Sequence, residues 1–241
     1  MSREFSCTAI VLKKQPFHES DELITFFTRE RGKVRALAKS IKLPKSRLQS
    51  RLQSLFLVNL RLAGGHLPKV IGAEPGEVFA GLREDLDCLK PAFYAAELAL
   101  KFTPDEQKNE PLFELLVGFL DFLNRHPVAA VRQAGLLRFK IGILETAGFA
   151  VRRLPPAAAL PPQVYFSRTA GGFVLGRPAD GAAVTAADYI NFERLAAADF
   201  AALPESPPAA LQDLFSGFIE YQLERRVKSE SFLRQIGPDV V

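Results

Sequence analysis

A run of lysine and arginine residues is the part of this sequence best suited to do chemistry. No acidic residue lies between Glu30 and Arg51, and the same stretch holds the cations Lys33, Arg35, Lys39, Lys42, Lys45, Arg47 and Arg51. Each cation that neutralises a phosphate releases a condensed counterion, so a basic strand and loop can follow a sugar-phosphate backbone without reading its base sequence. These seven residues predict a nucleic-acid-binding surface, and a solvated charged face is the alternative.

The charge of the chain is concentrated in its first part. Residues 1–75 hold 14 Lys and Arg against 6 Asp and Glu, a balance of +8, whereas the other 166 residues hold 17 against 21, a balance of −4. The formal charge of +4 for all 241 residues therefore conceals two regions of opposite sign. A basic module of this kind is typical of a polyanion binder.

The basic region alternates with a period of two, which predicts strands. Apolar runs at 9–12, 23–28, 33–39, 55–62 and 70–73 are separated by turn residues, and five short strands in this length predict a small barrel of the OB type. Within 33–39, one face carries Val34, Ala36 and Ala38, and the other carries Lys33, Arg35, Leu37 and Lys39.

Aromatic rings would add stacking surface for bases. The candidates are Phe17, Phe26 and Phe27, and the last two point to opposite faces because they are adjacent in a strand. We favour a place in the barrel core for these rings, with stacking by Phe17 in the turn as the alternative. The chain has no Trp, so electrostatic contact with the backbone must dominate any binding to single strands.

After Pro75 the apolar period becomes that of a helix. Apolar stripes at 91–102, 112–123, 128–147 and 211–219 predict four amphipathic helices that pack into a bundle. The stretch 153–184 interrupts them with Pro, Gly and Ala, and two short apolar runs around Gly171 and Gly172 predict a β-hairpin. The predicted fold class is α+β, with an OB-fold barrel over residues 1–76 and a helical domain over 77–241 that carries a hairpin insertion at about 153–184.

The helix at 128–147 carries Arg132, Arg138 and Lys140 among apolar residues. Cations at the rim of an apolar groove could hold a partner peptide that is both acidic and hydrophobic. The alternative is an ordinary amphipathic helix whose long side chains reach solvent.

The sequence offers no catalytic motif. The Gly-containing stretches at 62–69 and 176–181 do not fit a phosphate-binding loop, and the closest carboxylates, Asp85 with Asp87 and Glu19 with Asp21 and Glu22, suit helix caps or turns. Two Cys and three His residues, all widely separated, encode neither a disulfide framework nor a four-ligand zinc site. We therefore expect no enzyme, no metal and no cofactor. With no apolar stretch long enough for a signal peptide or a membrane span, we expect a cytoplasmic protein.

An ordered set of short motifs resembles the bacterial recombination mediator family RecO. Its N-terminal part is matched by residues 9–12, 19–21, 27–35, 38–40, 46–48 and 55–58, its central helix by 138–149, its insertion by 164–167 and 170–173, and its C-terminal part by 228–233. The resemblance implies an OB-fold followed by a helical domain, and a DNA-binding role in recombinational repair. It also implies binding of single- and double-stranded DNA, annealing of complementary strands, and loading of RecA, together with RecR, onto DNA coated by single-strand binding protein (SSB).

In the resembled family the helical domain docks the acidic, hydrophobic C-terminal tail of SSB, which makes Arg132, Arg138 and Lys140 the expected tail-binding residues. Many members hold zinc through four cysteines around the insertion, but residues 153–184 contain neither Cys nor His. We therefore expect this insertion to be held by packing of Val164, Phe166, Phe173 and Leu175. The protein is expected to be a monomer that associates with the nucleoid during repair. An RNA-binding OB-fold protein, a metal-dependent nuclease and a basic scaffold for acidic proteins are the alternatives.

Overall fold

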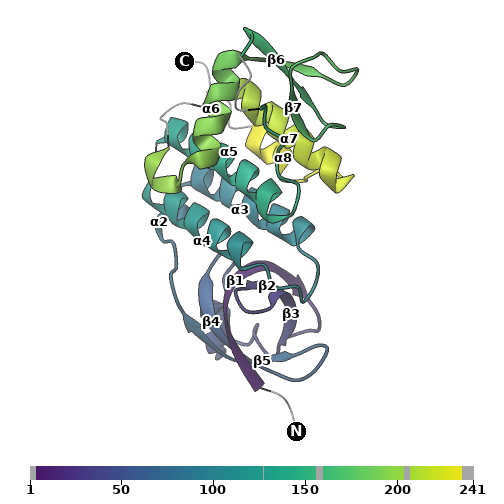
Figure 1. Ribbon diagram of the computed structural model, residues 1–241. Helices are drawn as coiled ribbons and strands as arrows, with labels where there is room; N and C mark the ends of the chain where they lie inside the picture. The colour runs from purple at the N-terminus through teal and green to yellow at the C-terminus, as the bar shows by residue number, and fades with distance from the viewer. Residues whose placement is uncertain (1–3, 127, 156–159, 204–206, 235–241) are drawn as a thin grey trace. The chain divides into compact units, whose positions relative to one another are not determined.

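The computed structural model describes residues 4–126, 128–155, 160–203 and 207–234 (Figure 1). The chain forms two compact units, residues 1–121 and residues 122–241. Residues 156–159 of the predicted insertion lie outside the described part of the chain. Among the described residues, no helix is both long and apolar enough to cross a membrane.

The first unit contains a closed five-stranded barrel, which confirms the predicted OB-like fold. Its strands are β1 (Glu4–Pro16), β2 (Glu22–Thr28), β3 (Gly32–Ala38), β4 (Leu57–Ala63) and β5 (Lys69–Pro75), and they neighbour one another in the order β1-β2-β3-β5-β4. All the pairings are antiparallel except β3 with β5, which is parallel and meets at Leu37 and Lys69. The barrel therefore closes through a short contact between β3 and β5.

Burial along the strands shows which side chains build the barrel. In β4, Val58, Leu60 and Leu62 lie in the core and Asn59 and Arg61 are exposed. Leu37 differs from its predicted outward position, since it is buried where β3 meets β5 and its backbone N–H donates to Pro68 O at 2.8 Å. The closing contact of the barrel thus covers a residue that strict alternation assigns to solvent.

Four helices belong wholly or largely to the first unit. They are α1 (Arg47–Arg51), α2 (Gly81–Glu84), α3 (Leu86–Phe102) and α4 (Glu110–Arg125), whose last residues enter the second unit. The Asp85 carboxylate caps α3 by accepting from the Asp87 N–H at 2.8 Å, which agrees with the capping role expected of this pair. Phe113 of α4 meets Phe27 of β2 with ring centroids 5.9 Å apart, so a helix buries the outer face of the barrel at this point.

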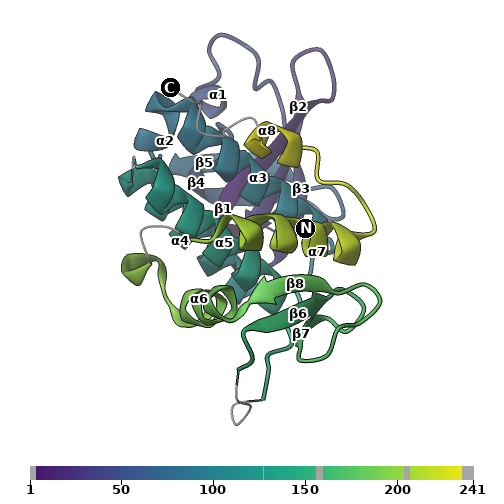
Figure 2. The same cartoon turned by 90° about the horizontal axis from the view of Figure 1, so that it is seen from above.

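The second unit is helical with a small sheet. Its helices are α5 (Ala129–Thr146), α6 (Ala186–Ala197), α7 (Ala209–Leu223) and α8 (Glu230–Arg234), with a short 3-10 helix at Phe200–Ala202. The predicted hairpin is a three-stranded sheet in the order β7-β6-β8, formed by β7 (Gly172–Val174), β6 (Gln163–Ser167) and β8 (Ala182–Thr185) (Figure 2). Sequence reasoning missed α6 and β8. The β8 segment is very short and made mostly of small residues, and the apolar stripe of α6 is limited to Tyr189, Phe192 and Leu195.

Aromatic packing holds this sheet on its unit. The Phe166 ring lies 5.1 Å from Phe173, 6.0 Å from Phe215 and 5.2 Å from Phe218, measured between centroids. Val164, Phe166 and Phe173 are buried as expected, but Leu175 is 44% exposed, so its predicted packing role is wrong. It follows β7 directly and lies in the loop that leads to β8.

Candidate nucleic-acid interface

The loop that follows β3, together with Arg47 at the start of α1, carries four of the predicted cations. Lys39, Lys42, Lys45 and Arg47 are all exposed. Within the described chain, no side chain of these four has a hydrogen-bond or ion-pair partner. We call these four residues the loop cations. Their charges face solvent without a competing carboxylate.

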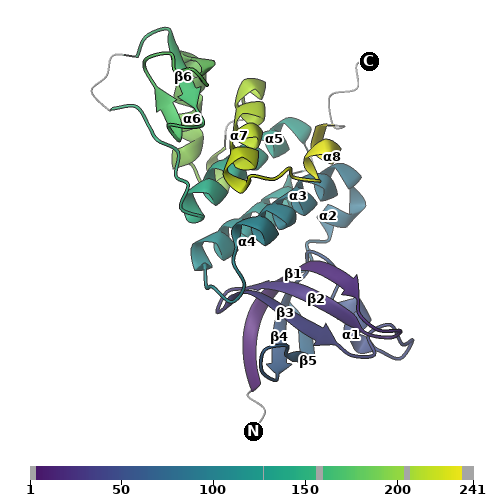
Figure 3. The same ribbon diagram turned by 90° about the vertical axis from the view of Figure 1, so that its right-hand side faces the viewer.

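Backbone contacts hold this loop against the turn between β1 and β2. The Ser40 N–H donates to Asp21 Oδ1 at 2.7 Å, and the Lys42 N–H donates to Ser20 O at 3.1 Å. Ile41 lies between them and is fully buried in the barrel core. The two turns meet at the same end of the barrel (Figure 3). The loop cations therefore project from an anchored backbone.

The cations of β3 are paired within the first unit. Lys33 Nζ donates to Leu100 O at 3.0 Å and lies 3.2 Å from Asp105 Oδ1. Arg35 Nη2 lies 3.6 Å from Asp105 Oδ2. The side chain of Lys33 is 16% exposed and that of Arg35 is 55% exposed. We call Lys33 and Arg35 the strand cations. A DNA phosphate would have to compete with the Asp105 carboxylate for both side chains.

A segment between α3 and α4, residues 103–109, brings Asp105 to the strand. The Glu106 N–H donates to Lys33 O at 2.9 Å, and this hydrogen bond joins the segment to β3 as an isolated parallel bridge. Gly32 has a φ of +69°, and a Cβ at that position would lie 1.8 Å from Gln107 O. Only glycine satisfies both the turn and the close approach of the segment. Lys33, Arg35, Asp105 and Glu106 also line a pocket of about 320 Å³ together with Leu23, His66 and Leu67.

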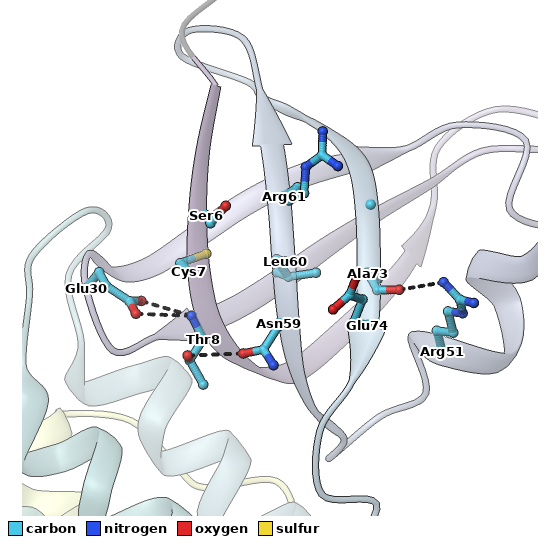
Figure 4. A pocket seen from close by; sticks show the side chains of 11 residues that line it. Ser6, Cys7, Thr8, Glu30, Arg51, Asn59, Leu60, Arg61, Ala73 and Glu74 are labelled. Carbon is cyan, nitrogen blue, oxygen red and sulfur yellow. Dashed lines mark hydrogen bonds between the residues drawn. The ribbon is translucent and has the colours of Figure 1, made fainter.

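Arg51 ends α1 and points to β5 instead of solvent. Its Nη1 donates to Ala73 O at 2.9 Å, as Figure 4 shows. The pocket of about 410 Å³ at this place is also lined by the carboxylates of Glu30 and Glu74. Arg51 therefore differs from the loop cations, because its guanidinium already fixes α1 to the barrel.

The same pocket reaches Cys7, whose chemistry is suppressed. Burial raises the pKa of the Cys7 thiol to about 12, and the charge of Glu30 adds to this effect. Cys7 is thus protonated at neutral pH and cannot act as a nucleophile.

Two further exposed cations were not singled out in the sequence. Lys13 lies near the end of β1, and Lys69 begins β5 opposite Leu37 of β3. Lys13 is followed in β1 by Lys14, which pairs with Glu22, and Lys69 is the one cation of β5. Neither lies in a long basic run, so only exposure on the folded barrel marks it as a candidate. Both belong to the first unit, as do the loop cations.

The aromatic candidates are divided by the fold. Phe26 and Phe27 are both fully buried, the first in the barrel core and the second against Phe113. Phe17 is 43% exposed in the turn between β1 and β2. Of the three rings, only Phe17 is available to a ligand.

The predicted cations of α5 are more buried than residues at the rim of a peptide-binding groove would be. Lys140 is 2% exposed, and its Nζ donates to Ser216 Oγ at 2.6 Å and to Gln212 Oε1 at 3.2 Å. Arg132 is 8% exposed. Arg138 is half-buried and its Nε donates to Ala198 O at 2.7 Å. Burial lowers the pKa of the Arg138 guanidinium, while the charges of Glu145 and Asp199 oppose that change. Arg132 and Lys140 therefore lie in the interior of the unit and not at its surface.

The insertion of this chain does not fit zinc. Its sequence has neither Cys nor His, and the described residues contain no group of three or more His, Cys, Asp or Glu side chains placed to hold a metal ion. The turn at the end of β6 is held by Asp180, which accepts from Ser167 Oγ at 2.8 Å and from the Thr169 N–H at 2.9 Å. Hydrogen bonds and packed rings thus hold this sheet.

Comparison with known proteins matches both parts of the chain to one family. Residues 1–79 match the model of the N-terminal part of recombination protein O, and residues 83–231 match the model of its C-terminal part. The chain is 33% identical to the DNA repair protein RecO of Anaeromyxobacter sp. (strain K), with 96% of each chain covered. It is 30% identical to the RecO of Myxococcus xanthus (strain DK1622), with 96% of this chain and 97% of the relative covered.

The chain belongs to the RecO family. This confirms the resemblance drawn from short motifs. A RecO protein has a role in DNA repair and recombination, and the barrel and helical region agree with the α+β architecture expected of RecO.

Proposed function

We propose that this RecO family member is a non-catalytic DNA-binding mediator of recombinational repair. It binds single- and double-stranded DNA through the barrel, anneals complementary strands, and acts with RecR to load RecA onto DNA coated by SSB. The observation that carries the proposal is the set of four loop cations, Lys39, Lys42, Lys45 and Arg47, exposed on an anchored loop with no partner in the described chain.

The loop cations support phosphate binding without base recognition. Their charges lie on one short segment, and neutralising several phosphates releases several counterions. Two strands brought to such a surface repel each other less, which favours their pairing. The strand cations and Arg51 complete the proposed DNA site, but in a secondary role because each of these three side chains has a partner within the unit.

We assign the partner peptide, the acidic tail of SSB, to the second unit. Arg138 is the most suitable of the three predicted residues, because it is half-buried whereas Arg132 and Lys140 are buried. A guanidinium can donate charge-assisted hydrogen bonds to a carboxylate of the tail. Arg132 and Lys140 support α5 from within in this proposal. Loss of tail binding in Arg138→Ala, but not in the matched surface variant Arg194→Ala, would support the assignment; equal binding by both variants would contradict it.

The DNA proposal is tested by fluorescence anisotropy of labelled oligonucleotides. Single-stranded DNA, duplex DNA and an RNA hairpin of equal length are titrated at low and physiological salt. We expect both DNA forms to bind, with affinity falling steeply as salt rises. A strong preference for the RNA hairpin would favour the RNA-binding alternative.

A second assay measures the rate at which two complementary labelled strands pair. The wild type should accelerate pairing, and the triple variant Lys42→Ala/Lys45→Ala/Arg47→Ala should not. The triple variant Arg177→Ala/Arg194→Ala/Arg225→Ala removes the same charge from exposed positions of the second unit and serves as the control. Equal annealing by wild type and loop variant would refute the role of the loop.

A further inference from the structure

The turn between β1 and β2 exposes an aromatic pair. Phe17 is 43% exposed, and its ring lies edge-on to His18 with centroids 4.4 Å apart. The Phe17 N–H donates to Asp21 O at 3.2 Å, which closes the turn that carries the two rings. Phe17 does not belong to the barrel core, and its neighbour His18 is exposed as well.

Hydrogen bonds tie this aromatic pair to the loop cations. Ser20 and Asp21, which follow the pair in the turn, accept from the backbone N–H groups of Lys42 and Ser40. The aromatic turn and the cationic loop are thus parts of one connected surface in the first unit. A ring with an exposed face beside several cations suits a single strand of nucleic acid. The ring can stack on a base, and the cations can bind the phosphates that flank that base.

We propose that Phe17, buttressed by His18, stacks a base of single-stranded DNA while the loop cations hold the neighbouring phosphates. The inference rests on the proposed function and adds to it a residue that distinguishes single strands from duplex. Bases of a duplex are already stacked on one another and expose only their edges, so a protein ring cannot reach their faces without opening the helix. The loop cations serve both DNA forms, whereas Phe17 serves only the single strand.

The absence of Trp from the sequence makes a direct test possible. Phe17→Trp introduces a sole indole at the turn, and Ile71→Trp introduces one on β5 at a residue that is also 43% exposed. Each variant is titrated with a single-stranded oligonucleotide and with an abasic strand of the same length and charge. We expect the strand with bases to quench the indole at position 17, and the abasic strand to leave its emission unchanged. The indole at position 71 should respond to neither.

Affinity provides the second readout. Phe17→Ala should weaken binding of the single strand by about tenfold, and leave its salt dependence and duplex binding unchanged. Equal affinities of Phe17→Ala and wild type for the single strand, or equal quenching at positions 17 and 71, would overturn the stacking role. If the loop variant still loses binding in that case, phosphate binding stands alone. If wild type binds neither strand at low salt, the proposed function fails together with this inference.

Discussion

The strand cations and the loop cations come from one uninterrupted basic stretch, yet the fold treats them differently. Lys33 and Arg35 meet the carboxylate of Asp105, and Lys33 also donates to a backbone carbonyl. Lys39, Lys42, Lys45 and Arg47 face solvent without a partner in the described chain. A charge counted in a sequence is therefore available to a ligand only where the fold supplies no competing anion.

The difference arises from a distant segment. Asp105 follows the strand cations by some seventy residues, and its approach depends on Gly32, whose missing side chain leaves room for Gln107. The loop is instead held by Ser20 and by Asp21, whose Oδ1 accepts a backbone N–H, so that carboxylate is engaged by the main chain. Anchoring through the backbone leaves the side-chain charges of the loop available.

The largest effect is expected from removing the loop cations. Lys42→Ala/Lys45→Ala/Arg47→Ala should weaken single-stranded DNA binding at moderate salt by about 10- to 100-fold, because about three phosphate contacts are lost. Anisotropy at fixed salt measures the change, with Arg177→Ala/Arg194→Ala/Arg225→Ala as the equal-charge control. A loss of similar size in the control would show that net charge, and not the loop, governs binding.

A smaller effect of opposite sign is expected at Asp105. Asp105→Asn removes the carboxylate that competes for both strand cations, so DNA should bind up to about fivefold more tightly at low salt. Glu106→Gln is the matched control, since it removes one negative charge from the same segment without a described ion pair. Equal DNA affinities of the two variants would contradict the proposed competition between Asp105 and DNA for the strand cations.

Gly32→Ala tests the same segment through the backbone. A Cβ at position 32 cannot coexist with Gln107 O at its present distance, so the segment must move away from β3. We expect faster hydrogen exchange at the Glu106 N–H, which donates to Lys33 O, together with tighter DNA binding. Unchanged hydrogen exchange at Glu106 would contradict the claim that Gly32 allows residues 103–109 to lie against β3.

Lys33 itself should contribute little to DNA affinity. Lys33→Gln is expected to change binding by less than about twofold, and to lower the free energy of unfolding of the first unit by about 1 kcal/mol through the lost contacts with Leu100 and Asp105. Urea unfolding and anisotropy on the same sample separate these effects. A large loss of affinity without a loss of stability would place Lys33 among the loop cations in function.

The smallest effect on DNA binding is expected from the thiol. Because the folded pKa of Cys7 is raised to about 12, the native thiol stays neutral where the unfolded thiol ionises. The contribution of the raised pKa to the free energy of unfolding is fully present below the unfolded pKa of about 8.5. It is lost progressively as the pH rises from there toward 12. Urea midpoints of wild type should therefore fall more between pH 7.5 and 9.5 than those of Cys7→Ala, while DNA binding at pH 7 stays the same in both. Parallel midpoints would contradict the raised pKa.

The sequence predicted the barrel and the main helices because period-two and helical stripes are long in both regions. It favoured the barrel core for both Phe26 and Phe27. The periodicity does not show that Phe27 is instead covered by Phe113 of α4. It could not separate Lys33 from Lys42, since the partner of Lys33 is remote in the chain. Arg132 and Lys140 were expected at a surface, whereas both are buried and Lys140 reaches polar groups of α7.

The central claim is tested most directly by the salt dependence of single-stranded DNA binding in two variants. One lacks Lys42, Lys45 and Arg47, and the other is Lys33→Ala/Arg35→Ala. We predict that the slope of log affinity against log salt becomes shallower by about 2 in the first variant and by well under 1 in the second. A slope that changes more in the strand variant than in the loop variant would contradict the account.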